Sequence, residues 1–164
     1  MEEAQDLAGP RSVGVTMLLC DSAQVAARKL FILGGGLATV GPNPQPVALA
    51  LLLDIPWDRA NISHEWAIDL VDEDGQPIMI GDKALQLRGK VESGRPAGAR
   101  PGSPQTVPIA INMGALRLPG NRRYTFQLSI QNESRPDWRV SFNTRPIPAS
   151  QQQQQNKPAS PPTA

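Results

Sequence analysis

The sequence is poor in the residues that build many functional sites. Its 164 residues include one cysteine and one histidine. A single cysteine excludes both an intramolecular disulfide and a zinc site made of several thiolates, and an unpaired thiol fits a reducing cytoplasm. A single histidine excludes a histidine-rich metal centre. The serine-hydrolase motif G-x-S-x-G and the zinc motif H-E-x-x-H are also missing, so we expect no cofactor.

Strong charge and long apolar runs are missing too. The formal net charge is +1, which does not favour a nucleic-acid binder. No apolar run reaches the ~18 residues of a membrane-spanning helix. The first residues, MEEAQDLAGPRS, are acidic and polar, unlike a secretory signal. The sequence therefore predicts a cytoplasmic protein that contacts neither membranes nor nucleic acid.

What the chain does have is apolar residues, proline and glycine. Hydrophobic residues make up 40 % of it, enough for a core, and 17 prolines with 14 glycines predict many turns. Residues 1–11 form a polar leader, and residues 12–147 carry the strand patterns. From 148 to 164 the chain is rich in Gln and Pro, a composition that predicts a disordered tail.

Apolar residues alternate with polar ones through most of the domain, the pattern of half-buried strands. The count, about eight or nine short strands, predicts an antiparallel β-sandwich of the immunoglobulin or jelly-roll kind. A closed barrel is the rival, but the runs are uneven in length. Only 22–28 reads as a short helical turn. The expected strands lie at 13–19, 29–33, 47–55, 66–70, 78–80, 85–91, 107–113, 124–130 and 138–142.

Three local patterns carry more detail. The run Val47–Ile55 is apolar on both faces, so we expect a central strand, with Ala48 and Ala50 leaving room for a covering layer. The three glycines that follow Leu33 predict a tight bend rather than a phosphate loop, because no nucleotide-binding spacing follows them. The last two strands flank 132–136 and should form a hairpin, while 93–105 should be an exposed loop.

Trp57, Asp58 and His64 are the candidate binding residues. Trp57 lies between two strands, where a large ring either anchors a partner or caps an open end of the sandwich. His64 could form an acid–base site with Asp54 or Asp58, but at a strand start we expect a solvated side chain. Cys20 should be a buried structural thiol.

Asp72 and Asp74 are candidate calcium ligands, because carboxylates gather there beside a glycine. The positions where a calcium loop needs further acidic residues hold Leu70 and Gly81. An Asp-Gly pair also forms a hairpin turn without any metal. We therefore favour a bare turn.

Charge is unevenly distributed along the chain. Residues 54–82 hold eight acidic residues and one basic residue, whereas residues 83–145 hold eleven basic and three acidic residues. On opposite faces of the molecule, these blocks would let copies associate head to tail. Interleaved across one sheet, they would form ordinary cross-strand pairs. We favour the interleaved arrangement.

Several longer motifs resemble a family of small proteins with a domain of unknown function. They are TMLLCDSAQV, KLFILGGG, IPWD, LVDEDGQP and WRVSF. The resemblance spans roughly residues 13–145. It implies a β-rich cytosolic protein of actinobacterial type, and it carries no catalytic residues over to this chain.

Together these observations predict a non-catalytic interaction module that binds a protein partner or itself. One alternative is a small-ligand or carbohydrate binder that uses Trp57 on an end loop. A second is an enzyme with a site around Asp54, Asp58 and His64. The sandwich fold does not decide among them, because it hosts both binding and catalysis.

Overall fold

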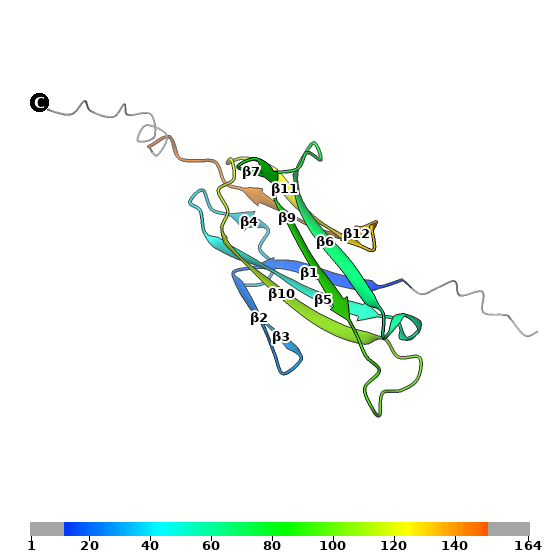
Figure 1. Ribbon diagram of the computed structural model, residues 1–164. Helices are drawn as coiled ribbons and strands as arrows, with labels where there is room; N and C mark the ends of the chain where they lie inside the picture. The colour runs from blue at the N-terminus through cyan, green and yellow to red at the C-terminus, as the bar shows by residue number, and fades with distance from the viewer. Residues whose placement is uncertain (1–11, 151–164) are drawn as a thin grey trace, which may run out of the picture.

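A computed structural model describes residues 12–150. The predicted leader, 1–11, and most of the predicted Gln/Pro tail therefore lie outside the described residues. The domain is a β-sandwich, as the alternation predicts, and the two sheets face each other in Figure 1. No helix in this part of the chain has the length and apolar character that crossing a bilayer requires.

The smaller sheet has three strands in the order β1-β5-β10 and is antiparallel throughout. The larger sheet has five strands in the order β4-β12-β11-β6-β9, and its one parallel pair is β4 with β12. The strands of the smaller sheet are β1 (Gly14–Cys20), β5 (Pro46–Ile55) and β10 (Gln105–Ala115). Those of the larger sheet are β4 (Thr39–Val40), β6 (Ser63–Asp72), β9 (Gln86–Glu92), β11 (Arg123–Ile130) and β12 (Glu133–Thr144).

The core lies between the two sheets. Strand alternation points every second side chain of each strand inward, and the fully buried ones come from both layers. Phe126 stacks on Phe142 with ring centroids 5.7 Å apart. Trp66 and Trp138 also pack against this cluster, as their alternation predicts. Aromatic rings from β11 and β12 thus stack side by side on the inner face of the larger sheet.

Trp66 needs a neighbour without a side chain. It stands opposite Gly89 in the pairing of β6 with β9. A Cβ at Gly89 would lie 2.3 Å from the Cζ2 atom of the indole, a distance that no side chain allows. The ring therefore lies across the β9 backbone, and the glycine provides that space.

β5 is covered on both faces, as its apolar pattern predicts. One face joins the main core, while Ala48 and Ala50 on the other face are buried beneath the hairpin β2–β3. This hairpin consists of β2 (Ser22–Ala26) and β3 (Lys29–Leu33) and forms a two-stranded sheet of its own. The small alanine side chains let it lie close to β5.

The helical turn expected at 22–28 is wrong, because this segment is β2 and the turn that follows it. Seven residues are too few to hold a helix without tertiary support. Here the side chain of Asn112 in β10 bonds the Ala23 backbone and favours the extended form. The one 3-10 turn of the described residues is η1 (Trp57–Arg59). The strand count also rises to twelve. The strand expected at 78–80 is β7 (Met79–Ile80), whereas β2, β4 and the partner of β7, β8 (Lys83–Ala84), are additional, because runs of two to five residues show little periodicity.

The turn and charge predictions are largely confirmed. β11 and β12 form a hairpin, although its turn is Gln131–Asn132 and β12 already begins at Glu133. The 93–105 segment connects β9 to β10 as a loop. Acidic β6 lies between the more basic β9 and β11, and Glu65 pairs with Lys90 at 2.9 Å. The charge blocks are therefore interleaved across one sheet.

Candidate functional site

Trp57 lies in η1 and is half-buried. The guanidinium carbon of Arg95 lies 4.8 Å from the centre of its ring. The same side chain donates a hydrogen bond from Nη2 to the Trp57 carbonyl oxygen at 2.8 Å. Arg95 thus covers one face of the indole and ties the 93–105 loop to η1.

The carboxylates near Trp57 are separated from the histidine. Asp58 is exposed on η1, and Asp54 accepts a hydrogen bond from the Thr106 hydroxyl at 2.5 Å. Within residues 12–150, no hydrogen bond or ion pair joins either carboxylate to His64. The three residues of the enzyme hypothesis are therefore not brought together as an acid–base pair.

His64 is buried, and its expected solvated environment is wrong. Its side chain is 3 % exposed, because its position in β6 shares the inward face with Ile68 and Leu70. Nε2–H donates to the Arg59 carbonyl oxygen at 3.0 Å, so a neutral ring must carry its hydrogen on Nε2. Nδ1 has no partner among the described residues. His64 also lines a small cavity of about 220 Å³ with Trp138, at the end of the core.

Asp72 and Asp74 form a turn. Oδ1 of Asp72 accepts hydrogen bonds from the backbone N–H groups of Asp74 at 3.0 Å and Gln76 at 2.8 Å. Gly75 follows with a φ of 76°, which glycine adopts without strain. The described residues contain no group of three or more His, Cys, Asp or Glu side chains placed to hold a metal ion.

Cys20 lies beneath the hairpin β2–β3 and is fully buried, as expected. Its Sγ–H donates to the Ala48 carbonyl oxygen at 3.4 Å. Burial, and to a smaller extent the charge of Asp21, raises the pKa of this thiol. The thiol stays protonated at neutral pH and is a poor nucleophile. The predicted glycine bend follows β3, with Gly34 and Gly36 both at positive φ.

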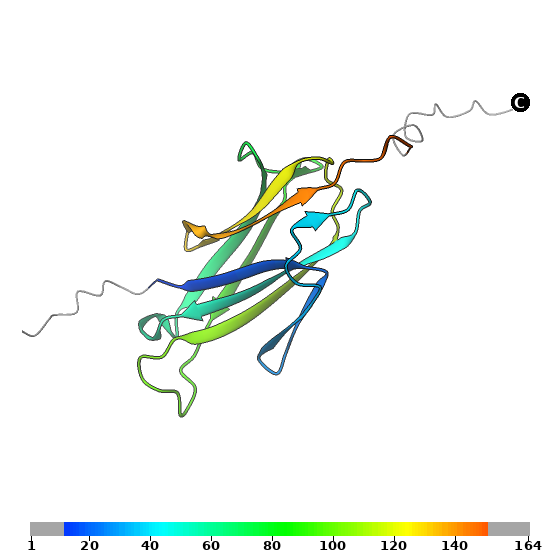
Figure 2. The same ribbon diagram turned by 180° about the vertical axis from the view of Figure 1, so that it is seen from behind.

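The apolar exposure of the hairpin is the most unusual feature of the domain. Four of its large apolar side chains are exposed: Phe31 by 55 % and Leu33 by 68 % on the outer face, and Val25 and Ile32 by 41 % each on the face turned to the smaller sheet. Clustered apolar exposure of this kind marks interaction sites. Figure 1 and Figure 2 both show the hairpin tip projecting from the body of the sandwich.

Strand pairing explains why both faces of the hairpin are apolar. Ala23 stands opposite Ile32 and Val25 opposite Leu30, so these four side chains share the face turned to the smaller sheet. Ala23 and Leu30 pack there on the buried alanines, whereas Val25 and Ile32 stay partly exposed. Phe31 falls on the other face, turned to solvent. The sequence held one signal of this arrangement. The run KLFIL has apolar residues at both alternating positions, so a two-layer structure can cover only one of its faces.

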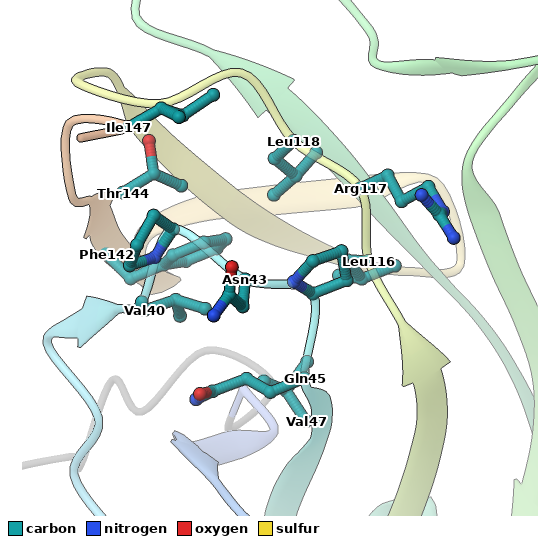
Figure 3. Close-up of a pocket in the computed structure, with 13 residues that line it drawn as sticks. Val40, Asn43, Gln45, Val47, Leu116, Arg117, Leu118, Phe142, Thr144 and Ile147 are labelled. Atoms are coloured by element: carbon teal, nitrogen blue, oxygen red, sulfur yellow. The ribbon is translucent and has the colours of Figure 1, made fainter. Parts of the chain in front are cut away.

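The end of the sandwich near β4 holds a second hollow, a cavity of about 290 Å³. Figure 3 shows Phe142, Leu116 and Leu118 around it, while the guanidinium of Arg117 points away from them. The hydroxyl of Thr144 in its wall already donates to the Pro119 carbonyl oxygen at 2.7 Å. The lining thus mixes apolar side chains with Asn43 and Gln45, and Arg117 is its one charged residue.

Comparison with known proteins adds a family and no activity. No curated protein matches the chain. The sequence profile of one family matches residues 15–143, which includes β2, β3 and most of both sheets of the sandwich. The chain therefore belongs to a family of unknown function, DUF6941.

Proposed function

We propose that this domain is a non-catalytic interaction module that binds a protein partner, or another copy of itself, through the hairpin β2–β3. The observation that carries the proposal is the exposed apolar surface of Val25, Phe31, Ile32 and Leu33. Covering such side chains on binding releases water from apolar surface, which is the main driving force of protein association.

The hairpin is fixed in place, which favours a docking role. Asn112 holds the Ala23 backbone with two hydrogen bonds, at 2.7 Å and 3.1 Å. Ala23 and Leu30 pack on the floor formed by Cys20, Ala48 and Ala50. An element ordered before binding loses little conformational entropy when a partner arrives.

The hairpin turn adds support. Ala27 and Arg28 both have positive φ, at 47° and 61°, in a two-residue turn whose usual residues are asparagine and glycine. Each such residue costs about 1 kcal/mol or more in backbone strain. Strained backbone is concentrated at functional sites, and here it lies at the tip of the exposed element.

The two alternatives have less support. A small ligand or carbohydrate stacking on Trp57 would compete with Arg95, which already covers one face of the ring. A thermal-shift and tryptophan-fluorescence screen tests this alternative. An enzyme around Asp54, Asp58 and His64 would need these groups to form an acid–base pair, which the fold does not bring together. A cellular defect caused by His64→Ala would support this alternative.

We also propose a cytoplasmic setting without membrane or nucleic-acid contacts. The support is the unpaired thiol of Cys20 and the near-neutral charge of the sequence.

The test of the proposed function is a pull-down with the tagged full chain from the native host, read by mass spectrometry together with the native mass of the bait. The test variant is Phe31→Ser/Leu33→Ser. The matched control is Met79→Ser/Ile80→Ser, because those side chains are equally exposed, at 54 % and 60 %, on a different hairpin. We expect wild type and control to share a stoichiometric partner that the test variant loses. Equal capture by all three proteins contradicts the proposal.

A further inference from the structure

We infer that the partner of the hairpin is a second copy of this chain, joined by antiparallel pairing of β3 with β3 about a two-fold axis. The result is a four-stranded sheet in the order β2-β3-β3-β2 that bridges two sandwiches. This inference rests on the proposed function and names the occupant of the same site.

The first argument is the open edge of β3. The two-residue turn makes Ala26 and Lys29 a hydrogen-bonded pair, and such pairs alternate along a hairpin. The next pairs do not bond each other, so their backbone N–H and C=O groups point away from the hairpin, in the plane of its sheet. These groups belong to Ala23 and Val25 on the β2 edge and to Leu30 and Ile32 on the β3 edge. Asn112 hydrogen-bonds the two groups of Ala23. Within residues 12–150, β3 pairs with β2 alone, so its outer edge has no strand beside it.

The second argument is the register that this edge dictates. Leu30 and Ile32 flank Phe31 symmetrically, so an antiparallel copy can be centred on Phe31. Leu30 of each copy then stands opposite Ile32 of the other, and each pair exchanges two backbone hydrogen bonds. The N–H and C=O groups of Leu30 and Ile32 are thereby all satisfied in each copy. The two Phe31 side chains meet at the axis as a close, non-hydrogen-bonded pair.

The third argument is charge complementarity, and it selects a second copy over an unrelated strand. The hairpin tip carries Arg28 and Lys29, while its base carries Asp21, which lies so close to Gly34 that a Cβ there would collide with its carboxylate. The antiparallel register places the tip of each hairpin beside the base of the other. The two ion pairs of the described residues involve none of these three groups. Each copy thus supplies the opposite charges that the other requires.

Cysteine cross-linking tests the register directly. In a Cys20→Ala background, Phe31→Cys puts a thiol next to its own symmetry mate, within reach of a disulfide. The matched control, Leu33→Cys, is at least as exposed as Phe31, but its register partner is Lys29. Two Leu33 positions would lie about 14 Å apart along the strands. Under mild oxidation of the full chain we expect a covalent dimer from Phe31→Cys and little from Leu33→Cys. Equal yields from both variants would overturn the pairing.

Sedimentation over a range of concentrations tests the open edge. Wild type should approach twice the monomer mass. Ile32→Pro removes an N–H group on the open edge of β3 and leaves the hydrogen bonds between β3 and β2 in place. Because of the two-fold symmetry, the dimer loses two hydrogen bonds between its copies. The dissociation constant should rise about tenfold or more. A charge reversal at both ends, Asp21→Arg with Arg28→Asp, should recover affinity that either substitution alone loses.

The outcomes separate the two proposals. A wild type that stays monomeric at every concentration, yet loses a captured protein in Phe31→Ser/Leu33→Ser, overturns self-pairing and leaves the docking role intact. A monomer that sediments with lipid vesicles through the same residues also overturns self-pairing. A monomeric wild type that captures the same proteins as Phe31→Ser/Leu33→Ser overturns both proposals.

Discussion

Two hairpins of this domain share one construction and differ in their surroundings. β2–β3 and β11–β12 are both antiparallel pairs joined by two residues at positive φ. β11–β12 lies inside the larger sheet, where Phe126 and Phe142 are buried and the other face is polar. β2–β3 packs one face against Ala48 and Ala50 of β5 and exposes Phe31 on the other. Local pairing therefore does not decide which face of a hairpin is covered, whereas the neighbouring layers do.

The turns make the same contrast. Gln131 donates from its backbone N–H to the Glu65 carbonyl oxygen at 2.8 Å and from its side chain to Ser63 at 2.9 Å, so β6 supports that turn. It also includes Asn132, a residue that tolerates positive φ. Ala27 and Arg28 have neither advantage in the hairpin β2–β3. One turn is built for stability, and the other is strained at an exposed tip.

The largest expected difference between the hairpins is in their aromatic side chains. Phe126→Ala should lower the free energy of unfolding by about 3–5 kcal/mol, because it leaves a cavity beside Phe142. Phe31→Ala, at a side chain that is half exposed, should change it by about 0.5 kcal/mol or less. Chemical denaturation of both variants measures this contrast. Similar losses would mean that Phe31 is part of the folded core.

The next effect concerns what holds β2–β3 to the sandwich. Asn112→Ala removes both hydrogen bonds to Ala23 and should favour local opening of the hairpin by about 1–3 kcal/mol. Hydrogen exchange at the Ala23 amide should accelerate, and the Cys20 thiol beneath the hairpin should react faster with a disulfide reagent. Asn112→Asp is the matched control, since it keeps the acceptor for the Ala23 N–H. Unchanged exchange in Asn112→Ala would show that packing alone holds the hairpin.

Exchanging turn residues should give a smaller effect of opposite sign. Ala27→Asn with Arg28→Gly relieves the strain of positive φ and should stabilise the domain by about 1 kcal/mol. Asn132→Ala in the other hairpin should cost stability. Thermal unfolding of the two variants compares the turns. A loss of stability in the first variant would argue that the Arg28 side chain has a structural partner.

The smallest effect is a pH dependence beneath the hairpin. Burial raises the pKa of Cys20 above its unfolded value, and that of Tyr124 likewise. The stabilisation from the protonated thiol is complete below the unfolded pKa and is lost as pH rises above about 8.5 towards the folded pKa. Stability should therefore decline in mildly alkaline solution, and less steeply in Cys20→Ala. Parallel curves for both proteins would contradict a buried thiol.

Alternation predicted the sandwich well, because buried strands must place apolar residues at every second position. It also predicted the covering layer over Ala48 and Ala50, since a central strand that is apolar on both faces requires one. It did not predict which segment supplies that layer. The run Ser22–Ala26 is short and has weak propensities, and the contact that fixes it, Asn112, lies 89 residues away.

The candidate site was harder to predict for the same reason. Its place at a strand start predicts a solvated His64, whereas inward alternation buries the side chain. Trp57 was correctly located between strands, but Arg95, which covers it, comes from a loop with no periodic pattern. Phe31 is exposed because no further layer of the described residues covers the hairpin, and a linear sequence does not report which layers a fold contains.

The indole of Trp66 lying across Gly89 has a consequence for how this family can diverge. Position 89 cannot change while tryptophan stands at 66, because any side chain at 89 meets the ring. An evolutionary path away from this pair must first shrink the residue at 66 and only then enlarge the one at 89. Relatives with a side chain at the second position should therefore lack tryptophan at the first, a joint substitution that can be read from their sequences.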